Sequence, residues 1–156
     1  FAGVKTLGLR NAPVTMDSVD WYTTSRMEAA LKANPNTDIA PYRDYYVKMC
    51  VTLSNHWDGV ARALGFRSLP HQTLMHHNVL NGHFLKDVLL ALQADGWTFV
   101  DASEALAFPD YHPIPHEPTS GRNWLTLKAR ETKIEIQPYP EQYLGFGRKT
   151  MDALGL

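Results

Sequence analysis

The sequence predicts an α/β fold in which a parallel sheet packs against helices. Three short apolar runs, within residues 10–15, 71–78 and 97–101, have the length and composition of buried strands. The longer segments between them have apolar residues every three or four positions, which is typical of amphipathic helices. Strands that alternate with helices along a chain favour parallel pairing, because two parallel strands need a crossover connection.

The first predicted strand leads into two helices. Asp20 or Thr23 can cap the first of these helices, and the sequence NPN ends it. Pro41 suits the first turn of a second and longer helix, whose apolar residues recur at spacings of three and four until Gly65 closes it. Together the two helices form a predicted helical insertion at about residues 22–65.

The second predicted strand, HQTLMHHN, precedes a helix over residues 82–94 that Asn81 caps. The run WTFVD predicts a third strand, which we expect to be buried. The sequence DASE then predicts a short helix that ends at about Phe108. Three parallel strands alone leave unpaired backbone groups at the edge of a sheet, so the sequence predicts a piece of a larger α/β unit.

The chain changes character after residue 108. Four of its ten prolines lie in PDYHPIPHEPTSG, which predicts a loop. Two apolar runs, WLTLKA and TKIEIQ, predict a hairpin, and a tail with a short terminal helix follows. We therefore expect residues 1–108 to form the α/β unit and residues 109–156 to form a loop, a hairpin and a tail.

The composition excludes several classes of protein. The 156 residues are 44% hydrophobic and 20% charged, with a formal net charge of -1, which indicates a packed globular protein without the basic excess that nucleic acid binding needs. No apolar run reaches the ~18 residues of a membrane span. Cys50 is the only cysteine, which excludes an internal disulfide and a cysteine-based zinc cluster. Phe1 is not a Met and opens no signal-peptide pattern, so we expect a processed or truncated N-terminus.

Two motifs at predicted strand ends carry the candidate chemistry. Asp17, Asp20 and Trp21 form a D-x-x-D-W pattern, and Leu74 and His76 form an L-x-H pattern. In this order, the two patterns resemble signature motifs of the polysaccharide deacetylase family (the NodB-homology domain, carbohydrate esterase family 4). The segment FLKDVLLALQADGWTFVDASEAL also resembles the last barrel unit of this family.

The resemblance implies the C-terminal part of a distorted (β/α) barrel, from a metal-dependent hydrolase that removes acetyl groups from an N-acetylated or O-acetylated polysaccharide. Family members hold a divalent metal, for which zinc is the expected ion here, through an Asp and a His pair near the N-terminus, beside an Asp that acts as base. This chain has no match to those residues before Asp17, so it is expected to be inactive alone. The expected partners are the missing N-terminal portion of the same protein and an acetylated polysaccharide or oligosaccharide, in the periplasm or outside the cell.

His76 and Asp17 are the expected catalytic residues. Hydrolysis of an amide expels an amine, which is a poor leaving group until it is protonated, and a histidinium near the nitrogen supplies that proton. A nearby carboxylate favours the charged histidine. We assign the acid role to His76 and the tuning role to Asp17. Asp20 is assigned a structural role, in orienting the loop or capping the next helix.

An apolar wall is expected beside this pair. Side chains alternate between the two faces of a strand, so Leu74 shares a face with His76, and Trp21 shares a face with Asp17 if that segment stays extended. Leu74 and Trp21 are therefore expected to bind the substrate by enclosing the acetyl methyl group. Asn78, which follows His76 by two positions, is expected to be structural and near the site.

Other interpretations remain open. A non-catalytic carbohydrate-binding remnant of the same fold would also retain these residues. An unrelated α/β hydrolase is disfavoured, because the sequence has no Gly-x-Ser-x-Gly elbow. His112 and His116 have a spacing that suits metal ligands on a helix, but HPIPH contains two prolines and is not helical. We therefore predict no metal site in this chain.

Overall fold

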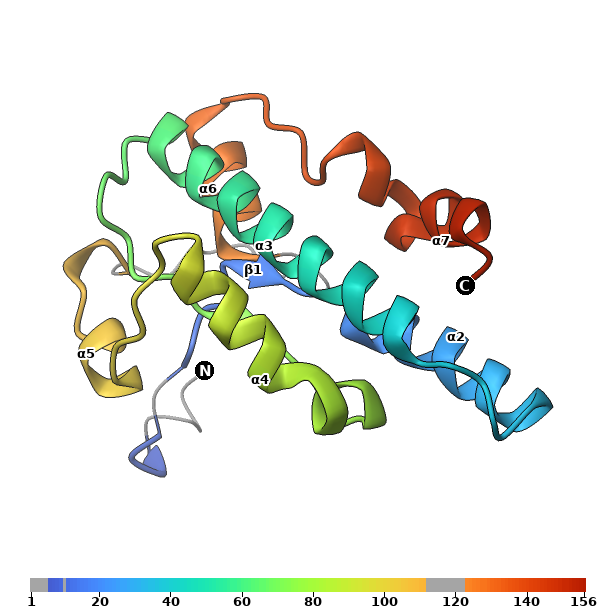
Figure 1. Ribbon diagram of the computed structural model, residues 1–156. Coiled ribbons are helices and arrows are strands. Elements are labelled where there is room, and N and C mark those ends of the chain that lie inside the picture. Colours follow the sequence, from blue (N-terminus) through green and yellow to red (C-terminus); the bar gives the residue numbers. More distant parts are fainter. Residues whose placement is uncertain (1–5, 10, 112–122) are drawn as a thin grey trace.

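A computed structural model describes residues 6–9, 11–111 and 123–156 (Figure 1). The fold is mostly helical and includes one small parallel sheet, so the predicted combination of helices with parallel strands is found. The part of the chain described here contains two short strands, which are too few to form a barrel. Within the same residues, no helix is both long and apolar enough to cross a bilayer.

The sheet consists of β1 (Met16–Asp17) and β2 (Thr73–Leu74), paired in parallel and in register from their first residues. The backbone N–H of Thr15 extends the pairing by donating to the carbonyl of Gln72 at 3.0 Å. Both strands are much shorter than predicted, and β1 begins after the predicted first strand ends.

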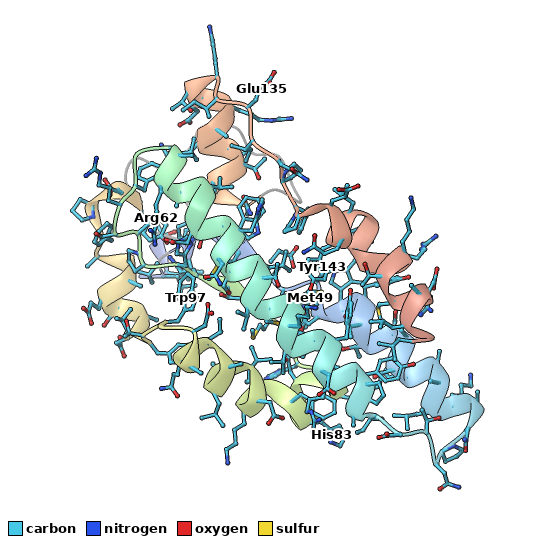
Figure 2. All side chains as sticks on the ribbon, turned by 45° about the horizontal axis from the view of Figure 1, so that its top comes forward. Met49, Arg62, His83, Trp97, Glu135 and Tyr143 are labelled. Carbon is cyan, nitrogen blue, oxygen red and sulfur yellow. The ribbon has the colours of Figure 1, made fainter. Side chains whose placement is uncertain are left out.

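The two helices predicted at about residues 22–65 are found as α2 (Asp20–Ala33) and α3 (Ala40–Ala63). In Figure 1, α3 crosses the centre of the molecule, between α4 on one side and the C-terminal segment on the other. Its buried side chains recur at spacings of three and four and form most of the core: Tyr42, Tyr45, Tyr46, Met49, Cys50, Leu53, Ser54, Trp57, Val60 and Ala61. Figure 2 shows Met49 within this packed centre, whereas Glu135 projects from the surface.

The next helix, α4 (Val79–Ala94), begins three residues earlier than predicted. The side chain of Asn78 caps it by accepting a hydrogen bond from the backbone N–H of Asn81 at 2.8 Å. The predicted cap at Asn81 is therefore wrong. The capping pattern DASE is confirmed, since Asp101 caps α5 (Ala102–Leu106).

The predicted third strand, residues 97–101, is not found. In the described part of the chain, this segment pairs with neither β1 nor β2, and Phe99 and Val100 are half-exposed. An apolar run becomes a buried strand only when a neighbouring strand satisfies its backbone and another element covers its side chains. Neither is provided by the residues described here.

The predicted hairpin after residue 122 is also wrong. Its first run forms α6 (Trp124–Thr132), which the side chain of Asn123 caps by accepting from the N–H of Thr126 at 2.9 Å. Leu125 and Ala129 are buried four positions apart, as a helix requires. The predicted proline-rich loop lies largely in residues 112–122, outside the described residues.

The C-terminal segment packs back onto the first two helices. After η1 (Pro109–Tyr111) and α6, the chain forms η2 (Glu141–Gly147) and the predicted terminal helix, α7 (Arg148–Leu154). An ion pair of 2.8 Å between Arg26 and Asp152 joins α2 to α7. The rings of Trp21 and Phe146 also meet, so this segment lies beside the beginning of α2, which carries one of the two candidate motifs.

Candidate active site at the ends of the two strands

A tight turn between β1 and α2 positions the first motif. The carboxylate of Asp17 accepts from the backbone N–H of Val19 at 2.9 Å, and the hydroxyl of Ser18 donates to the carbonyl of Leu74 at 2.9 Å. Val19 is buried with a φ of 51°. For a β-branched residue this left-handed conformation is strained, by roughly 1–3 kcal/mol. The turn reverses the chain and places Asp20 at the end of the neighbouring strand.

Asp20 is fully buried and accepts four hydrogen bonds. Its Oδ1 lies 2.7 Å from Nδ1 of His76, whose side chain is 45% exposed. Its Oδ2 accepts from the backbone N–H of His76 at 2.8 Å and from the side-chain amides of Asn78 and Asn81 at 2.8 Å and 2.7 Å. Because three N–H groups donate to Oδ2, the side chain of Asp20 serves as an acceptor, and we assign Nδ1 of His76 as the donor to Oδ1.

Two residues that the sequence analysis did not assign to the site hold this pair in place. The Nδ2 of Asn81 also donates to the carbonyl of His76 at 2.9 Å, and its Oδ1 accepts from the hydroxyl of Tyr46 at 2.7 Å. Burial raises the pKa of Tyr46, so its hydroxyl remains a donor. Neither residue was identifiable from the sequence, because an Asn near a helix start resembles a cap and a Tyr on an apolar stripe resembles a core residue.

His76 borders an open hollow at the start of α4. The other residues around this hollow are Met75, His77, Asn78, Val79, Asn81, Gly82 and Leu85. Since Nδ1 of His76 is bound to Asp20, Nε2 is the ring nitrogen left for a ligand. The site therefore combines a half-exposed imidazole with a buried carboxylate that fixes its orientation.

The predicted pairing of Asp17 with His76 is wrong, because Asp20 occupies that position. Asp17 instead holds the turn through the N–H of Val19 and lies beside Tyr139. Burial, and then the charge of Asp17, raises the pKa of Tyr139 to about 12. The alternation of faces that suggested Asp17 does not apply, since β1 ends at that residue and a turn follows.

The predicted apolar wall beside His76 is not found either. Leu74 and Trp21 are both exposed, and neither borders the hollow next to His76. Trp21 lies within α2, where successive side chains point about 100° apart, so it turns away from Asp20. Its ring packs against Phe146 instead. Asn78 lies where it was expected, with its side chain between Asp20 and the start of α4.

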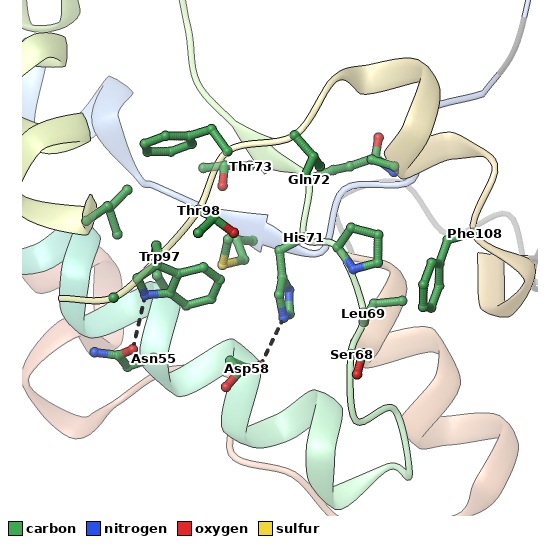
Figure 3. A pocket seen from close by; sticks show the side chains of 18 of the residues that line it. Asn55, Asp58, Ser68, Leu69, His71, Gln72, Thr73, Trp97, Thr98 and Phe108 are labelled. Carbon is green, nitrogen blue, oxygen red and sulfur yellow. Dashed lines mark hydrogen bonds and ion pairs between the residues drawn. The ribbon is translucent and has the colours of Figure 1, made fainter. Parts of the chain in front are cut away.

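A second hollow, shown in Figure 3, contains another histidine–carboxylate contact. Nε2 of His71 lies 3.6 Å from Oδ1 of Asp58, and Nδ1 lies 3.2 Å from the hydroxyl of Thr15. The side chain of His71 is 2% exposed, and burial lowers its pKa despite the opposing effect of Asp58. This ring is enclosed, so His76 is the better candidate for contact with a substrate.

The described residues include no group of three His, Cys, Asp or Glu side chains arranged to hold a metal ion. The spaced pair His112 and His116 lies outside the described residues. The zinc ion that the family resemblance implies therefore finds no set of ligands in this part of the chain.

Comparison with known proteins adds no relative. No family model, no curated protein and no solved structure matches the chain. The geometry of Asp20 and His76 therefore carries the functional argument.

Proposed function

We propose that Asp20 and His76 form the general-acid pair of a hydrolase that removes acetyl groups from a glycan, of the polysaccharide deacetylase type. One observation carries this proposal: a fully buried carboxylate lies 2.7 Å from Nδ1 of a half-exposed histidine. A carboxylate in this position fixes the tautomer and orientation of an imidazole and stabilises its charged form.

The pair supplies a proton to the leaving group. When water adds to the acetyl carbonyl and the C–N bond breaks, the sugar nitrogen needs a proton to leave as an amine. Nε2–H of the His76 imidazolium donates that proton, while Nδ1–H keeps its hydrogen bond to Asp20. The products are acetate and the free amino sugar, and the neutral ring regains a proton from solvent.

The surroundings of His76 favour this role, because its backbone is held from both sides. Its N–H donates to Asp20, and its carbonyl accepts from Asn81. Tyr46 in turn fixes the amide of Asn81. An acid that is positioned before the substrate arrives loses little freedom during the reaction, and this lowers the barrier.

The position of the pair in the fold also supports the proposal. Each motif follows the carboxyl end of a parallel strand, β1 or β2, and precedes a helix. In barrels and open sheets of the α/β class, active sites lie at this end of the strands. The proposal therefore includes a larger (β/α) barrel. Its zinc ligands and catalytic base come from an N-terminal portion of the same protein.

Acetate release from N-acetylglucosamine oligomers tests the proposal, with zinc added and with the natural polypeptide that carries this chain. His76→Ala and Asp20→Asn should each lower kcat, by about 10²–10⁴-fold for His76→Ala, whereas Asp17→Asn should have a much smaller effect. Unchanged turnover in His76→Ala would rule out the acid assignment. If the wild type binds the oligomers but releases no acetate, the result would instead favour a non-catalytic carbohydrate-binding remnant.

A further inference from the structure

The C-terminal segment places an exposed aromatic ring against the first motif. The rings of Trp21 and Phe146 meet edge to face, with centroids 4.9 Å apart and planes at 67°. The two residues are 43% and 45% exposed. Tyr22 lies behind them, with its ring centroid 6.0 Å from that of Phe146. The result is an aromatic corner, formed by Trp21 and Phe146, whose rings both face solvent in part.

The backbone at this corner is unusual. Gly145, Phe146 and Gly147 have φ values of 60°, 65° and 76°, which is three left-handed residues in succession. Glycine adopts this conformation readily, but Phe does not. Strain of this kind persists where the surrounding structure holds the backbone in place, and the ring of Phe146 is nearly half exposed here. The strained backbone of this turn thus holds an apolar ring at the surface.

The turn is also firmly held. Tyr143, just before it, is buried and packs edge to face on Tyr45 of α3. A side chain at Gly147 would overlap the hydroxyl of Tyr45, so the backbone there lies directly against the core. On the other side, Asp152 of α7 is tied to Arg26 of α2. The ring of Phe146 is thus presented by a fixed support, as expected of a preformed binding surface.

Polar groups surround the same turn. A hollow beside Phe146 is bordered by Glu141, Gln142, Leu144, Gly145, Arg148, Lys149 and Thr150. The ring supplies a flat apolar face, while the carboxylate, amide, hydroxyl and cationic side chains supply donors and acceptors. A pyranose ring has the matching chemistry, because its C–H face is apolar and its rim carries hydroxyl groups.

We propose that Trp21 and Phe146 form a sugar-binding subsite, in which an N-acetylated sugar unit stacks on the aromatic corner. This inference rests on the proposed function and identifies a substrate-binding residue in the C-terminal segment. Trp21 directly follows Asp20 in the sequence, but its side chain points away from Asp20 and does not border the hollow at His76. The subsite therefore binds a sugar unit other than the one that loses its acetyl group.

Titration of the protein with N-acetylglucosamine tetramer tests the subsite through binding alone. In ¹H–¹⁵N spectra, the indole signal of Trp21 and the backbone signals of residues 144–150 should shift. Phe146→Gly should weaken binding about five- to tenfold, the effect expected for loss of one aromatic contact. Phe99→Ala, which removes another half-exposed Phe far along the chain, should leave the affinity unchanged.

Thermal unfolding of the same variant separates binding from packing. Phe146→Gly relieves the left-handed strain, so the Tm should be equal to or higher than that of the wild type. A lower Tm with unchanged sugar affinity would overturn the inference, since the ring would then serve only to pack the tail. Absence of tetramer binding, or shifts confined to the hollow at His76, would also overturn it. Acetate release by the wild type reports on the proposed function independently of these results.

Discussion

Asp20 and His76 are 56 positions apart in the sequence, and their side chains meet at a distance of 2.7 Å between Oδ1 and Nδ1. The contact joins the two motifs of the chain at the ends of two paired strands. It depends on a strained turn at Val19, which aims Asp20 at the end of β2. A further layer of Asn81 and Tyr46 fixes both partners.

Removal of the Tyr46 hydroxyl should destabilise the protein. In Tyr46→Phe, the Oδ1 of Asn81 loses its buried donor, which should lower the free energy of unfolding by about 1–3 kcal/mol in urea denaturation. Tyr45 offers a matched control on the same helix, because its buried hydroxyl has no hydrogen-bond partner among the described residues. Tyr45→Phe should therefore be neutral or stabilising. Equal losses in both variants would contradict the network.

Gly147 should tolerate no side chain. Its φ is +76°, and an added Cβ would overlap the hydroxyl of Tyr45, so Gly147→Ala should cost more than about 1 kcal/mol of unfolding free energy. Gly155 has a similar φ of +71° but open space around it, so Gly155→Ala isolates the cost of the backbone alone.

A double variant separates the steric part of this effect. Tyr45→Phe removes the atom that an Ala at position 147 would meet, and should recover part of the stability lost in Gly147→Ala. If the two single effects simply add, the contact between this turn and α3 is not as described.

Local patterns in the sequence predicted the three longest helices, α2, α3 and α4, but not α6. The apolar side chains of α3 recur with a period that only a helix satisfies. The cap of α5 is local, since the side chain of Asp101 accepts from the N–H of Ser103, two positions along the chain. The strand predicted at residues 97–101 is wrong, because whether an apolar run forms a strand depends on partner strands elsewhere in the chain. WLTLKA alternates like a strand, but the cap at Asn123 and burial against the core make it helical.

The candidate site was predicted only in part. His76 and the first motif were recognisable, but the choice between Asp17 and Asp20 depends on where β1 ends. That boundary is set by the left-handed backbone of Val19, a conformation that β-branched residues rarely adopt. The contributions of Asn81 and Phe146 depend on contacts between distant segments, and the sequence carries no local signal for them.

His71 should make the protein less stable in mild acid. Burial lowers its pKa in the folded state, so the unfolded chain binds the proton more readily. Its contribution to stability is therefore complete above about pH 6.5, the ordinary value for histidine, and falls as the pH decreases below it. The polar groups that face the ring are Asp58, Arg62 and Thr15, and the ring of Trp97 packs edge to face on it.

Urea unfolding across this pH range measures the effect. His71→Asn keeps a polar group near Thr15 but cannot titrate, so its unfolding free energy should vary less with pH than that of the wild type. His83→Asn, at an exposed position on α4, is the control and should retain the wild-type slope. An unchanged slope in His71→Asn would contradict the assignment.

Cys50 should be unreactive in the folded protein. Burial raises the pKa of its thiol to about 12, and only the thiolate is nucleophilic. Iodoacetamide at mildly alkaline pH should therefore modify Cys50 slowly in buffer and rapidly in denaturing urea, as followed by mass spectrometry. Rapid modification of the folded protein would show that the core around α3 is open.

The protonation of the His76 ring nitrogens can be measured by two-bond ¹H–¹⁵N correlation spectra at a pH where the ring is neutral. We expect Nδ1 to carry the proton, because it donates to Asp20, and Nε2 to be unprotonated. Asp17→Asn should leave this pattern intact, whereas Asp20→Asn should change it. An Nε2–H tautomer in the wild type, or a change in Asp17→Asn as large as that in Asp20→Asn, would contradict the central claim.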